Sequence, residues 1–397
     1  MISFADKSDC CGCTACASIC GRGAISMQAD CEGFLYPHVD KERCVNCGLC
    51  VKACPVIRYD QHEFPQTEPD VYALHHKDED VWENSSSGGA FEALSNYILS
   101  QGGCIFGAIY NERWEVVHAM AETHEQAKVF RGSKYVQSDL RGIYPQVKKE
   151  LKKNRLVLFS GTPCQCAGLR GYLRKTYSNL FVVDIMCHSV PSPKIFAEYI
   201  HFVQKKAGSS IQAINMKDKT FGWGRQNLRV VFKNGKEWFN TPISNLWYSI
   251  FLSKYAARPS CYRCRFTNIS RPGDITIGDF WGIQEFHPEF YDKRGISFLF
   301  INNEKGQNLF SHVKRYYVHI QSSLALCSPW NLFHPIEAPA QRDAYWCDFK
   351  RKGFRYTSKK YFQYGMLNRW RRMMQQIASK MKFILKRSIL CFYKMRG

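Results

Sequence analysis

Two cysteines in the stretch RPSCYRCRF, Cys261 and Cys264, raise the first chemical question about this chain. A C-x-x-C pair supplies two soft ligands, whereas a tetrahedral metal site or an iron–sulfur cluster takes four. Cys164 and Cys187 follow two segments that are predicted to be buried strands, LVLFS and FVVDI. Because the carboxyl ends of such strands meet in one crevice, these thiols complete a candidate set of four. Spacing alone leaves an iron–sulfur cluster, a zinc site and unconnected thiols open.

The first 55 residues carry a repeated cysteine pattern with the spacing x2-x2-x3. CCGCTACASIC and CVNCGLCVKACP each contain it, and together the two runs hold most of the early cysteines. The repeat is the bacterial ferredoxin signature, in which the fourth cysteine of each run binds the other cluster. The predicted ligands are Cys10, Cys13, Cys16 and Cys54 for one [4Fe–4S] cluster, and Cys44, Cys47, Cys50 and Cys20 for the other. Two zinc sites are the alternative, which this spacing does not favour. Cys11 and Cys31 fall outside the pattern and are expected to be packed thiols.

Composition and hydropathy favour a cytoplasmic protein. Hydrophobic residues make up 45% of the 397 positions and charged residues 22%, which is ordinary for a globular chain. The start, MISFADKSDCC, lacks the basic and apolar regions of a secretory signal, and no apolar run approaches the roughly 20 residues of a membrane span. In that compartment, 19 cysteines are better explained as metal ligands than as disulfides.

Helices and strands are predicted to alternate after a polar, proline-containing linker at residues 61–70. The expected strands are CIFGAIY, RLVLFSG, NLFVVDIMC, DITIGDFWG and ISFLFIN, and LRVVFKNGKEWF is predicted to be a hairpin. Helices are expected between them, and Cys164 lies in the first turn of one, whose dipole should lower the pKa of its thiol. These elements favour an α/β or α+β domain with a mixed sheet at 71–345, preceded by a ferredoxin-type domain at 1–60. Motifs of the G-x-G-x-x-G or P-loop type do not occur in the sequence.

The predicted tail, residues 346–397, is strongly basic. Residues 351–397 carry 14 Lys and Arg and no Asp or Glu, out of a net charge of +21. In LNRWRRMMQQIASKMKFILKRSIL, apolar residues recur at helical spacing, which indicates a basic amphipathic helix. Such a helix can lie on an anionic membrane surface, here the inner face, or pack on the chain's own core or on a partner subunit. The mildly basic remainder does not favour a specific nucleic-acid partner.

The chain resembles the coenzyme F-420 hydrogenase/dehydrogenase beta-subunit family, in its form with an N-terminal ferredoxin dicluster. The matching stretches are SSSGGAF, GSKYVQS, SGTPCQ, CHSVPSP and CYRCRF followed by GDITIGDFWG. They occur in the order found in the family, across residues 71–300. The resemblance implies that this domain binds FAD and a third [4Fe–4S] cluster, held by Cys164, Cys187, Cys261 and Cys264. It also implies a small-molecule redox substrate and a redox partner such as a ferredoxin or another subunit, with coenzyme F-420 as one option.

The resemblance places FAD contacts in two loops. In NSSSGG, the contacts are Ser87, Gly88 and Gly89, whose backbone N–H groups precede a helix and are expected to face a phosphate. In GSKY, Lys134 is expected to balance the pyrophosphate charge and Tyr135 to stack on a ring. A Ser/Gly-rich helix cap and a solvated lysine are the alternative interpretation.

His188 and Asp279 are candidate proton donors near a flavin or a substrate, with a purely structural role as the alternative. The leading hypothesis is an iron–sulfur flavoprotein oxidoreductase that relays single electrons to FAD and exchanges a hydride with its substrate. Similar dicluster proteins resemble members of cell-surface polysaccharide pathways, so a sugar or its nucleotide conjugate is a candidate substrate. The alternative is a non-catalytic electron-transfer subunit of a larger complex.

Overall fold

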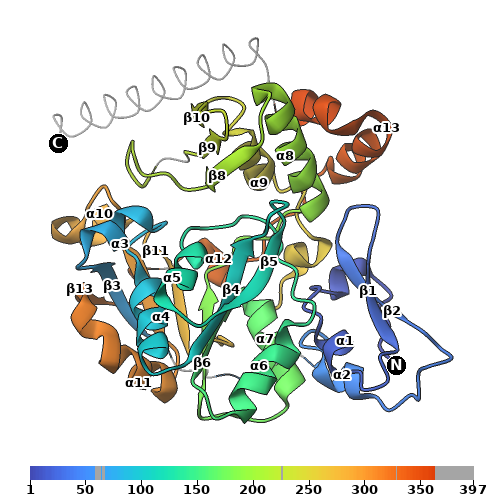
Figure 1. Cartoon of the computed structure of the whole chain (residues 1–397), viewed down its shortest axis with the longest axis horizontal. Helices are drawn as coiled ribbons and strands as arrows, with labels where there is room; N and C mark the ends of the chain where they lie inside the picture. The colour runs from blue at the N-terminus through green and yellow to red at the C-terminus, as the bar shows by residue number, and fades with distance from the viewer. Residues whose placement is uncertain (59–63, 65–67, 225–226, 328, 363–397) are drawn as a thin grey trace, which may run out of the picture.

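The structure is a computed structural model that describes residues 1–58, 64, 68–224, 227–327 and 329–362 (Figure 1). The predicted tail helix and most of the predicted linker lie outside these residues. The dicluster domain, residues 1–58, forms the blue region at one side of Figure 1. Its elements are η1 (Lys7–Asp9), α1 (Ala15–Ile19), β1 (Ile25–Ala29), β2 (Leu35–Val39) and α2 (Leu49–Ala53). Strands β1 and β2 pair antiparallel, and the two short helices contact each other.

The centre of the molecule is a mixed eight-stranded sheet with the order β13-β3-β12-β11-β7-β6-β4-β5. Its strands are β3 (Asp70–His76), β4 (Cys104–Tyr110), β5 (Val116–Ala121), β6 (Val157–Gly161), β7 (Leu180–Ile185), β11 (Ile275–Asp279), β12 (Ser297–Ile301) and β13 (Tyr317–Ser322). Strands β4, β6, β7 and β11 run parallel, and the other four pair antiparallel. With the dicluster domain in front of it, this sheet confirms the predicted fold class.

Helices cover both faces of the sheet. Helices α4 and α11 pack together against one face, and α6 and α7 cover strands on the other. The helices that accompany this sheet are α3 (Glu79–Asn84), α4 (Ala90–Ser100), α5 (His124–Ala127), α6 (Ile143–Lys152), α7 (Pro163–Leu173), α10 (Ile283–Phe286), α11 (Glu304–Val313) and α12 (Trp330–Phe333). The 3-10 turns are η3 (Lys128–Phe130), η4 (Pro259–Arg263), η5 (Pro288–Phe290) and η6 (Lys314–Tyr316). Among the described helices, none is both long and apolar enough to cross a membrane.

A second, smaller unit packs beside the sheet and differs from the predicted domain plan. The predicted hairpin, β9 (Arg229–Phe232) and β10 (Glu237–Phe239), pairs with β8 (Ile211–Asn215) in a separate three-stranded sheet instead of joining the main one. Helices α8 (Pro193–Ala207), α9 (Leu246–Ser253) and α13 (Arg342–Tyr361) share its core (Figure 1). The predicted boundary at residue 345 falls inside α13, because this helix buries Tyr345 and Trp346 in that core.

A buried ion pair between Asp184 and Arg271 fixes the loop that follows Cys261 and Cys264. Asp184, on β7, has no exposed surface and accepts a hydrogen bond of 2.7 Å from Arg271 Nη2 and one of 2.9 Å from the backbone N–H of Gly273. We expect Arg271→Met to lower the free energy of unfolding by about 3–5 kcal/mol, because it leaves the buried Asp184 carboxylate without its ion-pair partner. Urea unfolding measures this change. The matched control is Arg263→Met, which breaks an exposed pair with Asp6 and should cost at most about 1 kcal/mol; equal costs would contradict the prediction.

Candidate functional site

The inner site consists of Cys10, Cys13, Cys16 and Cys54, the crossed set that the sequence pattern predicts. The first three thiols come from the first run, and Cys54 follows α2 at the end of the second. Burial, and then the neighbouring Cys10 and Cys54 thiols, together raise the pKa of Cys16 to about 12. All four line a cavity of about 10 Å³, roughly the space that one water needs. These four thiols would hold the inner cluster.

The outer site consists of the other four predicted ligands of the dicluster domain, Cys20, Cys44, Cys47 and Cys50. Cys20 ends α1 and Cys50 is buried on α2, and these two helices contact each other. Cys47, on the loop that precedes α2, is exposed, and the neighbouring Val45 is 59% exposed. The outer site therefore lies at the surface of the dicluster domain.

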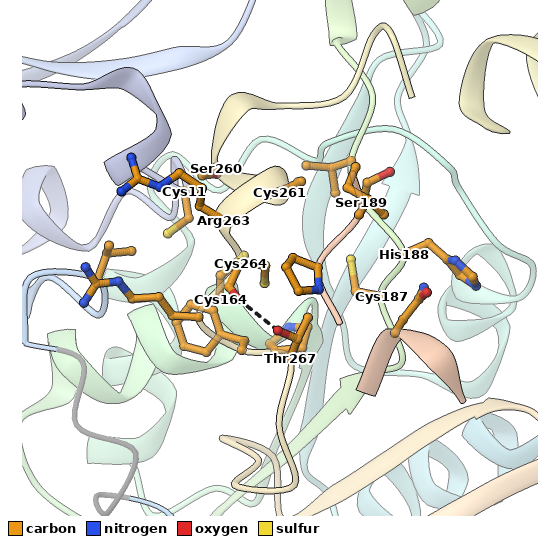
Figure 2. Close-up of a pocket in the computed structure, with 18 of the residues that line it drawn as sticks. Cys11, Cys164, Cys187, His188, Ser189, Ser260, Cys261, Arg263, Cys264 and Thr267 are labelled. Carbon is orange, nitrogen blue, oxygen red and sulfur yellow. Dashed lines mark hydrogen bonds between the residues drawn. The ribbon is translucent and has the colours of Figure 1, made fainter. Parts of the chain in front are cut away.

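The third site consists of Cys164, Cys187, Cys261 and Cys264, which line one cavity of about 110 Å³. Figure 2 shows these cysteines arranged around the same space. The volume exceeds the ~10–15 Å³ that a single water needs, so the cavity can hold a group of several atoms. Within the described part of the chain, no group of three or more His, Cys, Asp or Glu side chains is arranged to hold a single metal ion.

Local structure explains why these four thiols meet. Strands β6 and β7 are parallel neighbours, so the segments that follow them emerge at the same edge of the sheet. Thr162 and Gln165 form a capping box with Pro163 in the first turn, which fixes Cys164 at the start of α7. Cys187 follows β7 by two residues, and η4 brings in the C-x-x-C pair from a distant part of the chain. The sheet and η4 together assemble the set.

The thiols of the third site oppose each other's ionisation. Burial raises the pKa of Cys187 well above its ordinary value, and the neighbouring thiols of Cys261, Cys164 and Cys264 raise it further. The pKa of Cys164 is also raised, first by a hydrogen bond with Cys11 and then by burial, so the expected lowering by the helix dipole is not found. Coordination resolves this conflict, because a metal centre stabilises the thiolate. The donor set therefore fits an iron–sulfur cluster.

The charged side chains around the third site are mostly basic. Arg263, Arg265 and Arg271 line its cavity, and Asp9 is the one acidic residue among the described lining residues. Four thiolates give a cluster net negative charge, which a basic wall stabilises.

Cys11 is a fifth thiol at this cavity, and the sequence pattern assigned it no ligand role. It is 7% exposed and lines both the inner and the third cavity. Its thiol interacts with those of Cys13 and Cys164, and its carbonyl accepts a 3.0 Å hydrogen bond from Gln137 Nε2. Cys11 therefore connects the inner site to the third site. No spacing rule could have indicated this, because the contact joins two domains.

A buried cation lies beside Asp279. Asp279 Oδ2 is 2.5 Å from Lys217 Nζ, and Lys217 is 5% exposed. No described residue accepts a hydrogen bond from this ammonium group with favourable geometry. Trp223 Nε1 donates to Asp279 Oδ1 at 3.1 Å, and the rings of Trp223 and Trp281 stack with centroids 4.4 Å apart. A ligand here would find an aromatic surface and a cation with unused donors. The sequence indicated Asp279 but not Lys217, since a lone lysine in a loop carries no signal.

His188 lies between the third site and Asp279. Its side chain is exposed and points away from the cysteines in Figure 2. Desolvation lowers its pKa, while the Asp279 carboxylate acts in the opposite direction. The imidazole is therefore mainly neutral near pH 7 and can accept a proton.

The two loops expected to contact FAD lie side by side, but one of their glycines has a different role. Ser133 N and Oγ both donate to Ser86 Oγ, at 2.7 and 2.9 Å. The Gly88 N–H donates to Ser297 Oγ at 2.9 Å, and a Cβ on Gly88 would lie 2.2 Å from the Leu74 carbonyl oxygen. Gly88 therefore packs against the sheet, and its N–H does not face a phosphate as expected.

The remaining predicted FAD contacts are Lys134, Tyr135, Ser87 and Gly89. Lys134 Nζ donates to four carbonyl oxygens at the end of η3, so it is not the solvated or phosphate-facing lysine that was expected. These acceptors belong to Val129, Phe130, Arg131 and Gly132. Burial lowers its pKa to about 7. Tyr135 stacks on Phe251, 4.7 Å between centroids, and its pKa is raised by burial and then by the Asp279 carboxylate. Ser87 Oγ donates to the Ile296 carbonyl at 2.7 Å. Gly89 begins α4 with φ +80°.

Comparison with known proteins finds two family matches and a similar solved structure. Residues 9–57 match the 4Fe-4S dicluster domain, and residues 154–323 match the C terminus of the coenzyme F420 hydrogenase/dehydrogenase beta subunit. A solved chain from the F420-reducing [NiFe] hydrogenase complex of Methanosarcina barkeri is similar, with 18% identity and a TM-score of 0.44, covering 75% of this chain and 90% of that one. A search of curated proteins finds no match. The chain therefore combines an N-terminal 4Fe-4S dicluster domain, at residues 9–57, with a region at residues 154–323 that matches the C terminus of the coenzyme F420 hydrogenase/dehydrogenase beta subunit.

Proposed function

We propose that this chain is an iron–sulfur flavoprotein oxidoreductase with clusters at the inner, outer and third sites and a flavin beside Lys217 and Asp279. The observation that carries the proposal is the continuity of these sites. The outer site lies at the surface, Cys11 lines both the inner and the third cavity, and His188, next to Cys187, is close enough to Asp279 for that carboxylate to act on its pKa. When bound, clusters carry single electrons, and a flavin converts them into two-electron hydride chemistry.

The residues around Lys217 support the flavin part of the proposal. The flavin ring is flat and aromatic with oxygen and nitrogen acceptors along one edge. Trp281, which stacks on the buried Trp223, is 49% exposed and offers a stacking surface, and the Lys217 ammonium has three N–H donors, more than its ion pair with Asp279 needs. A cation at that edge also stabilises negative charge on the reduced ring.

The two loops joined by Ser86 and Ser133 support a place for the rest of FAD. Ser87 and Gly89 lie at the start of α4, an 11-residue helix whose N-terminal end favours a phosphate. Lys219 Nζ donates to the Ser87 carbonyl at 3.0 Å and reaches towards Lys217 and Asp279. Lys219 bonds two carbonyl oxygens, those of Trp82 and Ser87, whereas Lys134 bonds four, so Lys219 is the better candidate to face a pyrophosphate. Tyr135 also lies in the region of Asp279, and His188 and Asp279 are the proposed proton-transfer groups for the flavin or the substrate.

Lys217→Met is expected to weaken flavin binding at least tenfold. The substitution keeps most of the side-chain volume but removes the donors, and a hydrogen bond from a charged group contributes roughly 1.5–3 kcal/mol. Flavin that remains after gel filtration of the anaerobically purified protein gives the measurement, and iron content should not change.

The matched control for this variant is Lys305→Met. Lys305 is another desolvated lysine, and its Nζ donates to the Tyr177 carbonyl at 2.6 Å, away from Asp279. This variant should retain full flavin. Full retention in Lys217→Met would remove the assignment of the flavin to this region.

The function itself is tested by anaerobic purification with quantification of iron, sulfide and flavin, followed by mixing with hydride donors. The panel includes reduced coenzyme F-420 and NAD(P)H, with nucleotide sugars as candidate acceptors in view of the polysaccharide hypothesis. Turnover by the isolated chain supports the oxidoreductase. A protein without flavin or turnover that exchanges electrons with a ferredoxin would support the second candidate, an electron-transfer subunit, which the exposed outer site favours.

A further inference from the structure

Arg258 is a fully buried arginine at the junction of the dicluster domain and the main domain. Its relative exposure is 0%, and it directly precedes η4, the turn that carries Cys261. Its backbone N–H donates to the Val190 carbonyl at 3.0 Å, which fixes the residue in the main domain. The side chain extends from there into the dicluster domain.

The guanidinium group of Arg258 is bound by neutral groups and by one cluster ligand. Nε donates to the Cys10 carbonyl at 2.8 Å, Nη2 to the Leu35 carbonyl at 2.9 Å, and Nη1 to Gln137 Oε1 at 2.9 Å. Nη2 also lies 3.7 Å from Cys10 Sγ, and the Tyr36 ring centroid is 4.5 Å away. Within the described part of the chain, no carboxylate forms an ion pair with it.

The backbone of the inner site is shaped around this cation. Gly12 has φ +70°, and a Cβ there would lie 2.6 Å from Arg258 Nη1. Gly12 lies between the proposed ligands Cys10 and Cys13, and only a glycine at this position lets the backbone pass this close to the guanidinium. The contact is therefore part of how the inner site is built.

A buried guanidinium needs a compensating negative charge, because arginine does not deprotonate in proteins. The nearest source is the inner site, whose four thiolates give a [4Fe–4S] cluster net negative charge. Each reduction adds one electron and one more negative charge, so a fixed cation nearby stabilises the reduced cluster more than the oxidised one. The surrounding interior has a low dielectric constant, which strengthens this effect.

We propose that Arg258 is the charge partner of the cluster held by Cys10, Cys13, Cys16 and Cys54 and raises its reduction potential. This inference rests on the proposed function, since it requires a cluster at the inner site. Arg258 acts through Cys10 and is a positioning residue that touches neither substrate nor flavin. The exposed outer site has no such partner among the described contacts, so electrons should collect at the inner site, next to the third.

The test is a redox titration of the anaerobically purified full chain, followed by EPR spectroscopy. Arg258→Gln removes the charge and keeps a hydrogen-bond donor. It should shift the reduction equilibrium of one cluster at least tenfold towards the oxidised form, which is 59 mV for one electron. The affected signal should be the one that Cys16→Ser protein lacks. Arg258→Lys should shift it less.

Arg342→Gln is the matched control. Arg342 also joins the two domains, but it pairs with a carboxylate, Glu32, instead of a cysteine ligand. All potentials should be unchanged in this variant. Full iron content with no shift in Arg258→Gln, or an equal shift in Arg342→Gln, would overturn the inference. If Arg258→Gln loses iron, Arg258→Lys should retain it, and equal loss in both would show that packing, not charge, is responsible. A wild-type protein with no inner cluster would instead refute the proposed function.

Discussion

Replacing Cys261 and Cys264 together by serine should remove about a third of the iron from the anaerobically purified chain. Three sites of four iron atoms each predict about twelve iron atoms per chain, and the pair supplies half of the ligands of one site. The other two sites draw their ligands from residues 10–54 alone. They should therefore keep their iron. The measurement is iron per chain, with the dicluster EPR signal as a check on the remaining sites.

The control for this variant replaces two exposed cysteines, Cys31 and Cys347, which removes the same number of thiols away from any proposed site. This double variant should keep all of its iron. A Cys11→Ser variant then identifies the fourth ligand, because five cysteines line the third cavity. Loss of four irons from Cys11→Ser, with none lost from Cys187→Ser, would mean that Cys11 replaces Cys187 in the ligand set. Unchanged iron in the Cys261/Cys264 variant would show that the pair is not part of a cluster site.

Gly171→Ala should destabilise the protein, although helix propensity alone predicts the opposite. In an exposed helix, this change is worth about 0.5–1 kcal/mol of added stability. Gly171 lies on the face of α7 that contacts the dicluster domain, where a Cβ would lie 2.4 Å from the Ala53 carbonyl oxygen. Overpacking of this kind typically costs about 1–3 kcal/mol. Urea unfolding should show a net loss, and iron at the adjacent inner site should become easier to remove with a chelator.

The control for the glycine variant is Gly224→Ala, because a Cβ at Gly224 meets no atom within 4 Å. Stability and iron retention should be unchanged in this variant. Gly168, one turn before Gly171, gives a second test at the same surface, since its Cβ would lie 2.8 Å from Cys13 Cβ. If both α7 variants are as stable as wild type and retain iron equally well, then close packing on α7 does not hold the dicluster domain in place.

Local patterns in the sequence were sufficient for the elements and for the dicluster domain. Short continuous apolar runs predicted β4, β6, β7, β11 and β12, because a strand that is buried on both faces carries apolar residues at successive positions. The helix with Cys164 in its first turn was predicted and is α7, and the crossed inner set was predicted from cysteine spacing and lines one cavity. In these cases the information lies within a few residues, so neighbours in sequence are enough to predict the structure.

The sequence alone could not decide how distant segments are paired. The hairpin at 229–239 joins β8 in its own sheet, and α13 continues past the expected boundary, because packing with α8 and α9 determines both. The predicted FAD contacts of Gly88 and Lys134 were wrong for a similar reason. The Gly88 N–H donates to Ser297 Oγ, and the Lys134 ammonium donates to carbonyl oxygens at the end of η3. No local motif specifies either contact.

The connections between sites depended most on tertiary structure. Cysteine spacing predicted which thiols hold the two N-terminal clusters, and family resemblance indicated the third set. Only the folded chain places Cys11 between two of these sites, Arg258 against Cys10, and Lys217 beside Asp279. Each of these contacts joins residues far apart in sequence, and a buried charge or thiol acquires its role from what surrounds it. The sequence thus predicted the ligand sets, and the tertiary structure determined how the residues of these sites are connected and charged.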